Sequence, residues 1–186
     1  MNAPWIPEAR RRRFTTDDVI RMVETGLLRA DERVELIEGE LALMSPKHNK
    51  HEWLKARLIR WLVPRLADDL ILTVESTLYL STRNFIEPDI MIYSAALLPE
   101  SVRGPDTRLL IEVADSSLSF DLGVKAALCA EHGIEHYWVV DADTKVTHVH
   151  ANPSASGYAS VVAVDPDAPL TLPFAAGLSL KIGELM

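Results

Sequence analysis

The sequence predicts an α/β fold of the α+β type, in which helices flank a mixed central sheet. The prediction rests first on the order of apolar segments: a long helix, three strand-like runs, a second helix and a further strand. It rests also on composition, because 48% of the 186 residues are hydrophobic and 25% are charged. That composition can fill a core and argues against disorder. We expect one domain over residues 1–186.

A short helix and a hairpin are expected in the first quarter of the chain. Thr16, followed by two aspartates, is typical of a helix cap, and the apolar stripe after it stops near Gly26. Residues 34–44 then alternate imperfectly around Glu38-Gly39, which predicts two short strands joined by a tight turn.

The clearest helix covers residues 51–67, because its leucines and Trp61 recur at spacings of three and four. One face of this helix should be buried. The later elements follow in order: strands over 70–80, 86–93 and 108–113, a helix over about 120–132 that ends at Gly133, a strand over 136–140, and short strands over 146–150, 158–164 and 170–172.

The chain is expected to be cytoplasmic and to stay out of membranes. Its only cysteine, Cys129, cannot form an intrachain disulfide, and residues 1–13 carry arginines where a signal peptide needs an apolar core. No apolar segment reaches the roughly 18 residues that a membrane-spanning helix requires.

The charge distribution is compatible both with a local nucleic-acid-binding surface and with ordinary solvated surface. A net charge of -8 disfavours nonspecific attraction to DNA, but a local basic face is compatible with it. One basic cluster is at 10–13. The other surrounds the start of the long helix and comprises Lys47, Lys50, Lys55, Arg57 and Arg60. Either cluster can be ordinary solvated surface, and Lys47, Lys50 and Lys55 are the candidates for nucleic-acid contact.

Acidic residues follow two of the predicted strands in a pattern that suits metal-dependent phosphodiester hydrolysis. Asp89 closes the motif Glu87-Pro88-Asp89, Glu112 lies in an apolar run, and Lys125 comes after both. Hydrolysis needs a divalent cation that stabilises phosphate charge and generates hydroxide. Mg²⁺ keeps several waters and takes only one or two carboxylates, so Asp89 and Glu112 suffice. We therefore predict a Mg²⁺ site, with Mn²⁺ as a substitute.

Each of these residues also has a purely structural interpretation. Asp89 could simply begin a strand. Glu112 should be buried, so it needs a partner, which could be a metal or an ion pair with Lys125. Asp121 and Lys125 are four residues apart on one helical face and could form an ordinary surface ion pair.

A series of motifs in fixed order resembles one known family. The motifs are Arg33-Val34-Glu35-Leu36-Ile37-Glu38-Gly39-Glu40, Met44-Ser45-Pro46, His51, Glu87-Pro88-Asp89, Glu112-Val113-Ala114-Asp115-Ser116-Ser117, Asp121, Lys125, Gly133-Ile134 and Tyr137-Trp138-Val139-Val140-Asp141. Together they resemble the Uma-type restriction endonucleases of prokaryotes, within the PD-(D/E)XK nuclease-like superfamily.

The resemblance implies a restriction-endonuclease-like fold with a nuclease core at about 48–141, an N-terminal hairpin and extra C-terminal strands. It implies that Asp89 and Glu112 hold the metal and that Lys125 polarises the attacking water or neutralises the phosphate. Two positions depart from the pattern. Ala114 stands where the superfamily usually has lysine, so Lys125 would be its replacement. Cys129 stands where the family more often carries tyrosine.

Four further residues could support the site. His51 opens the long helix, where it could position water or contact a phosphate, although it could equally be exposed. Glu38 could supply a third carboxylate or face solvent, and Glu35 is equally ambiguous. Asp121, four residues before Lys125, is the fourth candidate.

Three functions are compatible with the sequence. The first is a Mg²⁺-dependent endonuclease acting on DNA, expected as a homodimer because cutting two strands needs two sites. The second is a nuclease-fold protein without catalysis that binds nucleic acid or a protein partner. The third is a nonenzymatic oligomerisation module.

Overall fold

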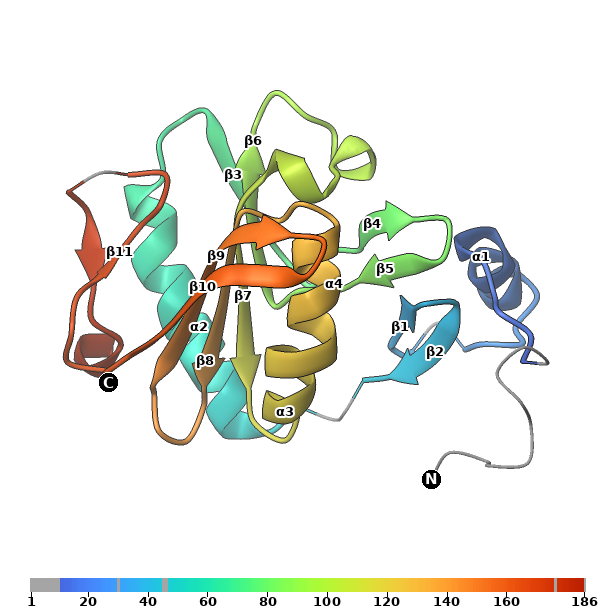
Figure 1. Ribbon diagram of the computed structural model, residues 1–186, viewed down its shortest axis with the longest axis horizontal. Helices are drawn as coiled ribbons and strands as arrows, with labels where there is room; N and C mark the ends of the chain where they lie inside the picture. The colour runs from blue at the N-terminus through green and yellow to red at the C-terminus, as the bar shows by residue number, and fades with distance from the viewer. Residues whose placement is uncertain (1–10, 30, 45–46, 176, 186) are drawn as a thin grey trace. The chain divides into compact units, whose positions relative to one another are not determined.

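The computed structural model describes residues 11–29, 31–44, 47–175 and 177–185 (Figure 1). Its residues group into two compact units. The first comprises Met1–Met44 with Tyr79–Ile86, and the second comprises Ser45–Leu78 with Glu87–Met186. Arg10 of the first basic cluster and Ser45-Pro46 of the family motif lie outside the described residues.

The first unit is built on a helix and a small antiparallel sheet. Helix α1 (Thr16–Glu24) is capped by Thr15, one residue before the predicted cap. Thr15 Oγ1 accepts from the Asp18 N–H at 3.2 Å, and the Asp18 carboxylate accepts from the Thr15 N–H at 2.9 Å. The sheet has the order β2-β1-β5-β4. Its strands are β1 (Val34–Ile37), β2 (Glu40–Leu43), β4 (Leu78–Ser81) and β5 (Asn84–Ile86).

The predicted hairpin in this unit is confirmed. Strands β1 and β2 pair antiparallel, and the turn between them holds Glu38 at φ 54° and Gly39 at φ 78°. A side chain at Gly39 would meet Arg13 Cβ at 2.8 Å, so the close approach of the chain also requires glycine there.

The second unit contains the predicted mixed sheet, with strand order β10-β9-β8-β7-β6-β3. All neighbours are antiparallel except β7 and β8, which are parallel. The six strands are β3 (Leu70–Val74), β6 (Ile90–Ser94), β7 (Thr107–Ala114), β8 (His136–Asp141), β9 (Thr147–Ser154) and β10 (Gly157–Val164). A separate pair, β11 (Leu170–Thr171) and β12 (Ser179–Leu180), lies near the C-terminus.

Helices of the second unit cover the sheet and link its parallel strands. Helix α2 (Asn49–Leu62) buries Leu54, Leu58 and Leu62 in the same core as Leu109 and Ile111 of β7. The crossover from β7 to β8 consists of α3 (Leu118–Phe120), the π-helical turn η5 (Asp121–Lys125) and α4 (Ala126–Glu131). Single 3₁₀ turns are η2 (Val63–Arg65), η3 (Pro99–Ser101), η4 (Gly104–Asp106) and η6 (Ile182–Leu185).

Two of the predicted strands are wrong in the same way, because each is broken in two. The run 70–80 is divided into β3 and β4, since Glu75 adopts φ 52° and interrupts the extended backbone. The run 86–93 is divided between β5 and β6, with Glu87–Asp89 between them. Pro88 has no N–H to donate to a strand ladder, which explains this second break.

Within the described ranges, we find no helix whose length and apolar character would let it span a bilayer.

Candidate metal centre

The two carboxylates predicted to bind metal lie opposite each other on neighbouring strands of the second unit. Asp89 immediately precedes β6, and Glu112 lies in β7. The antiparallel register pairs Ile90 with Ile111, so the next position of each strand brings Asp89 opposite Glu112. Asp89 N–H donates to Glu112 Oε2 at 3.2 Å. Each residue is 4% exposed, so the sheet places two buried carboxylates side by side.

Backbone hydrogen bonds fix Asp89 in this position. The Val113 N–H donates to Asp89 Oδ2 at 2.9 Å. The Glu75 N–H lies 3.1 Å from the Pro88 carbonyl and 3.4 Å from the Asp89 carbonyl. Glu75 is not among the site residues predicted from the sequence, because the run 70–80 is expected to form one continuous strand. Its only signal was a charged residue within an apolar run.

Lys125 reaches Glu112 from the crossover. Its Nζ donates to Glu112 Oε1 at 3.1 Å and lies 3.6 Å from Asp121 Oδ1. Lys125 and Asp121 are each 3% exposed. The prediction of an ordinary surface ion pair between them is therefore wrong, because the sheet and crossover enclose both.

The π-helical turn positions these side chains. Such turns accommodate one more residue than an α-helical turn and occur frequently at functional sites. Asp121 at its start is held twice: Ser117 Oγ donates to Asp121 Oδ2 at 2.6 Å, and the Tyr137 hydroxyl donates to the Asp121 carbonyl at 3.1 Å. Because Tyr137 is fully buried in β8, the turn is anchored to the core sheet.

Two side chains near the start of α2 also contact Asp89. His51 Nε2 is 2.9 Å from Asp89 Oδ2, and Lys47 Nζ donates to Asp89 Oδ1 at 2.7 Å. Burial alone would raise the pKa of Asp89, but the hydrogen bond and charge of His51, together with the Lys47 ammonium, hold that pKa far below its ordinary value. The alternative that His51 is exposed is wrong, because it is 6% exposed.

The three lysines predicted to contact nucleic acid all pair with carboxylates. Besides Lys47, Lys55 donates to Glu52 Oε1 at 2.8 Å and also to Glu75. Burial opposes the charge of Lys55, but these two hydrogen bonds raise its pKa above the ordinary value. Lys50 Nζ lies 2.7 Å from Asp115 Oδ1. Their contact with nucleic acid stays a prediction.

The two remaining supporting candidates belong to the first unit. Glu35 is buried in β1 at 2% exposure. Glu38 is exposed at the hairpin turn, where its N–H donates to Asn84 Oδ1 at 2.6 Å and its carbonyl accepts from Arg13 at 2.9 Å. A role for either glutamate in the metal centre stays a prediction.

The donor chemistry of the pair suits a hard divalent ion. Among the residues that the structure describes, no group of three or more His, Cys, Asp or Glu is arranged to hold a metal. Two carboxylates fit Mg²⁺, which completes its shell with water and phosphate oxygens. Each carboxylate oxygen has two lone pairs, so an oxygen that accepts one hydrogen bond from an ammonium group can also coordinate an ion. Ammonium groups and a metal would therefore share these oxygens.

Comparison with known proteins identifies the family of this chain. A family model described as "Putative restriction endonuclease", named Uma2, matches residues 18–183. The chain belongs to the Uma2 family. The resemblance expected from the motifs is thus confirmed, and the match includes Asp89, Glu112 and Lys125. Membership in the Uma2 family supports a nuclease-like function.

A solved structure has the same fold. It is described as a "putative nuclease belonging to DUF820" from Anabaena variabilis, and it matches with a TM-score of 0.71. The similarity covers 92% of this Uma2 chain and 97% of the other, at 20% sequence identity. This likeness confirms the predicted nuclease-like fold. A search of curated proteins found no match.

Proposed function

We propose that this Uma2 protein is a Mg²⁺-dependent endonuclease that hydrolyses phosphodiester bonds of DNA. The observation that carries the proposal is the convergence of Asp89, Glu112 and Lys125, all buried, at the junction of β6, β7 and the π-helical turn. Two hard oxygen donors beside a fixed ammonium suit phosphate chemistry.

Each residue has a distinct role in this proposal. Asp89 and Glu112 hold the ion, which when bound supplies an acidified water and offsets phosphate charge. Lys125, fixed beside Glu112, orients the water by hydrogen bonding or neutralises the charge that develops on the phosphate. His51 keeps Asp89 ionised and oriented. Ala114 carries no ammonium, so a lysine from the neighbouring turn takes over that function.

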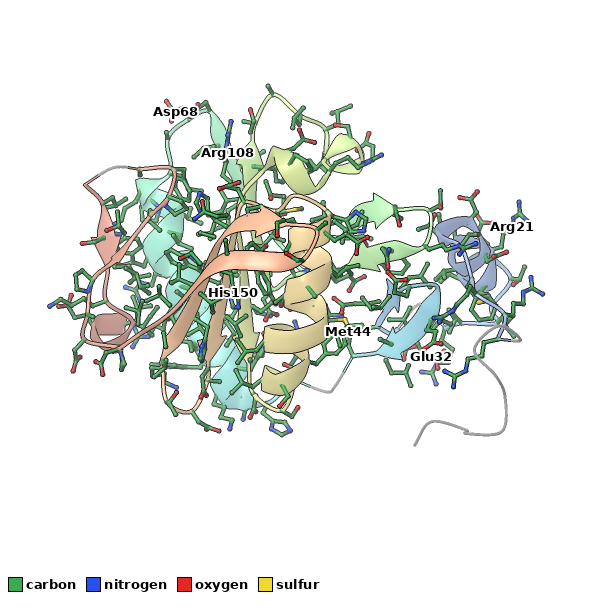
Figure 2. The ribbon with its side chains drawn as sticks, viewed as in Figure 1. Arg21, Glu32, Met44, Asp68, Arg108 and His150 are labelled. Carbon is green, nitrogen blue, oxygen red and sulfur yellow. The ribbon has the colours of Figure 1, made fainter. Side chains whose placement is uncertain are left out.

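Cleavage of supercoiled plasmid DNA in Mg²⁺ tests the proposal. We expect nicked or linear product with the unaltered protein. Asp89→Asn should cleave at least about a hundredfold more slowly, which is the size of effect measured when one group that stabilises a transition state is removed. The matched control is Asp68→Asn, since Asp68 is exposed in the loop before β3 (Figure 2). Undiminished cleavage by Asp89→Asn would overturn the assignment.

One observation favours a second candidate, a nuclease-fold protein that binds nucleic acid or a protein partner without cleavage. Lys47 and Lys125 already pair with Asp89 and Glu112, so each of these two carboxylates has an ammonium partner without an ion. This candidate predicts DNA affinity that is equal in EDTA and in Mg²⁺, with no cleavage in either. The proposed endonuclease instead predicts product in Mg²⁺ alone.

A homodimer is part of the proposal, because cleavage of both strands of a duplex needs two centres. Light scattering at working concentration tests it. A dimer without nuclease activity would favour the oligomerisation module.

A further inference from the structure

A hollow lies at the opposite end of α2 from the acidic centre. His51 is in the first turn of α2, whereas the hollow begins near its last turns and has a volume of about 290 Å³. It is lined by Arg57, Arg60, Trp61, Arg65, Glu184 and Leu185. Three of these six residues are arginines, in a chain with a net charge of -8.

These arginines are not neutralised by neighbours. Among the described residues, none of Arg57, Arg60 and Arg65 forms an ion pair with a carboxylate. The one carboxylate that lines the hollow, Glu184, lies 3.1 Å from Lys181 Nζ. The hollow therefore carries an excess of positive charge that an anionic ligand would balance.

Aromatic stacking holds two of the guanidinium groups in place. Arg57 lies over the Trp53 ring at 4.9 Å, and Arg65 lies over the Trp61 ring at 4.5 Å. Arg65 also donates to the Trp61 carbonyl at 2.8 Å. A stacked guanidinium keeps N–H groups at its edge, and its planar fork matches the oxygens of a phosphate. The hollow is thus ordered for phosphate recognition before a ligand arrives.

The spacing of the arginines favours a polymer over a single phosphate. Helix α2 continues into the 3₁₀ turn η2, so from Arg57 to Arg65 the chain advances by roughly 12–14 Å at rises of about 1.5 and 2.0 Å per residue. Successive phosphates of one DNA strand are separated by roughly 3.4 Å along the axis, so the row spans about three or four nucleotides.

We propose that this arginine hollow is a second nucleic-acid contact site, which binds the phosphodiester backbone at a distance from the acidic centre. The choice of nucleic acid among polyanions rests on the proposed function. His51 and Arg60 are about 14 Å apart along the axis of α2, so a length of roughly four base-pair steps covers this axial distance. The site anchors DNA while the acidic centre acts on it.

Fluorescence anisotropy of a labelled 30-base-pair duplex in EDTA tests the proposal without cleavage. The test variant is Arg57→Gln/Arg60→Gln/Arg65→Gln. The control is Arg21→Gln/Arg83→Gln/Arg108→Gln, which removes the same charge from exposed positions outside the hollow, two of which, Arg21 and Arg108, are labelled in Figure 2. We expect the test variant to raise Kd at least about tenfold and to reduce the salt slope by about two to three. The control should change Kd less than about threefold.

Several outcomes would overturn the proposal. Equal weakening in both variants would show a net-charge effect only, and absence of binding by the unaltered protein would remove the site. Displacement of the duplex by low-millimolar inorganic phosphate would indicate a site for small phosphate esters. Stronger displacement by polyglutamate than by unlabelled DNA would indicate an acidic protein partner.

Plasmid cleavage and Mn²⁺ titration of the same variants separate this inference from the proposed function. If the unaltered protein binds the duplex through the arginines but does not cleave DNA, the contact site in the hollow is supported and the endonuclease is refuted. If the unaltered protein cleaves DNA, and the test variant binds and cleaves it equally well, the nucleic-acid contact site in the hollow is refuted and the endonuclease is not. Mn²⁺ affinity unchanged in the test variant shows that its fold and acidic centre are intact.

Discussion

The cationic residues along α2 fall into two groups with opposite surroundings. Near its N-terminus, Lys47, Lys50 and Lys55 all pair with carboxylates. Toward its C-terminus, Arg57, Arg60 and Arg65 line a hollow and form no ion pair within the described part of the chain. In the sequence, most of these residues form one basic cluster. The difference shows that the role of a charge depends on the acids that the sheet brings beside it.

The largest effect is expected when a buried pair of the acidic centre is broken. Lys125→Met should lower the free energy of unfolding by about 3–5 kcal/mol, because Glu112 stays buried and loses the ammonium beside it. Urea denaturation measures this change. The double variant Glu112→Gln/Lys125→Met should recover part of the loss, since the buried charge of Glu112 is removed while Asp121 still lacks the Lys125 ammonium. A loss below about 1 kcal/mol in Lys125→Met would contradict the assignment of this pair.

An intermediate effect is expected for metal affinity when Lys47 is removed. Lys47 donates to Asp89 Oδ1, so its ammonium and a divalent ion compete for the same carboxylate. Lys47→Met should tighten Mn²⁺ binding about tenfold, equivalent to about 1.4 kcal/mol. Lys50→Met, a matched change within α2, should alter it less than about twofold. Weaker binding in Lys47→Met would show instead that Lys47 positions Asp89 for the ion.

The smallest effect is expected for the partly exposed pair of Lys50 and Asp115. The hydrogen bond from Lys50 holds the pKa of Asp115 below its ordinary value, against the opposing effect of burial. A carboxylate with a lowered folded pKa stabilises the fold above its unfolded pKa, and this contribution is lost as pH falls through the folded pKa. Lys50→Met should therefore lower Tm by about 2 °C or less at neutral pH and leave it unchanged near pH 2. Equal losses at both pH values would contradict this.

The sequence predicts the residues of the centre better than their surroundings. Asp89 and Glu112 follow from residue type at strand ends, because burying a carboxylate requires a partner. The strand register that places them opposite each other depends on pairing between distant segments. Lys125 follows from its place after the two acids, and its role from the family resemblance, but its burial depends on a π-helical turn that the helical pattern of 120–132 does not reveal.

The supporting residues were less predictable for the same reason. Glu75 contacts Lys47 and Lys55 only because its left-handed backbone ends β3 and turns the chain. Local β propensity in 70–80 gives no sign of that conformation. The arginine hollow likewise needs η6 from the C-terminus to complete its wall, so the basic residues of α2 alone could not indicate it.

The most direct test of the central claim, that Asp89 and Glu112 hold a divalent ion, is a calorimetric titration of Mn²⁺ at low salt. The unaltered protein, Asp89→Asn and the exposed control Asp68→Asn would be compared. We predict saturable binding in the first and the control, and at least about a hundredfold weaker binding, equivalent to about 2.7 kcal/mol, in Asp89→Asn. Equal binding by all three proteins, or none in any, would contradict the claim.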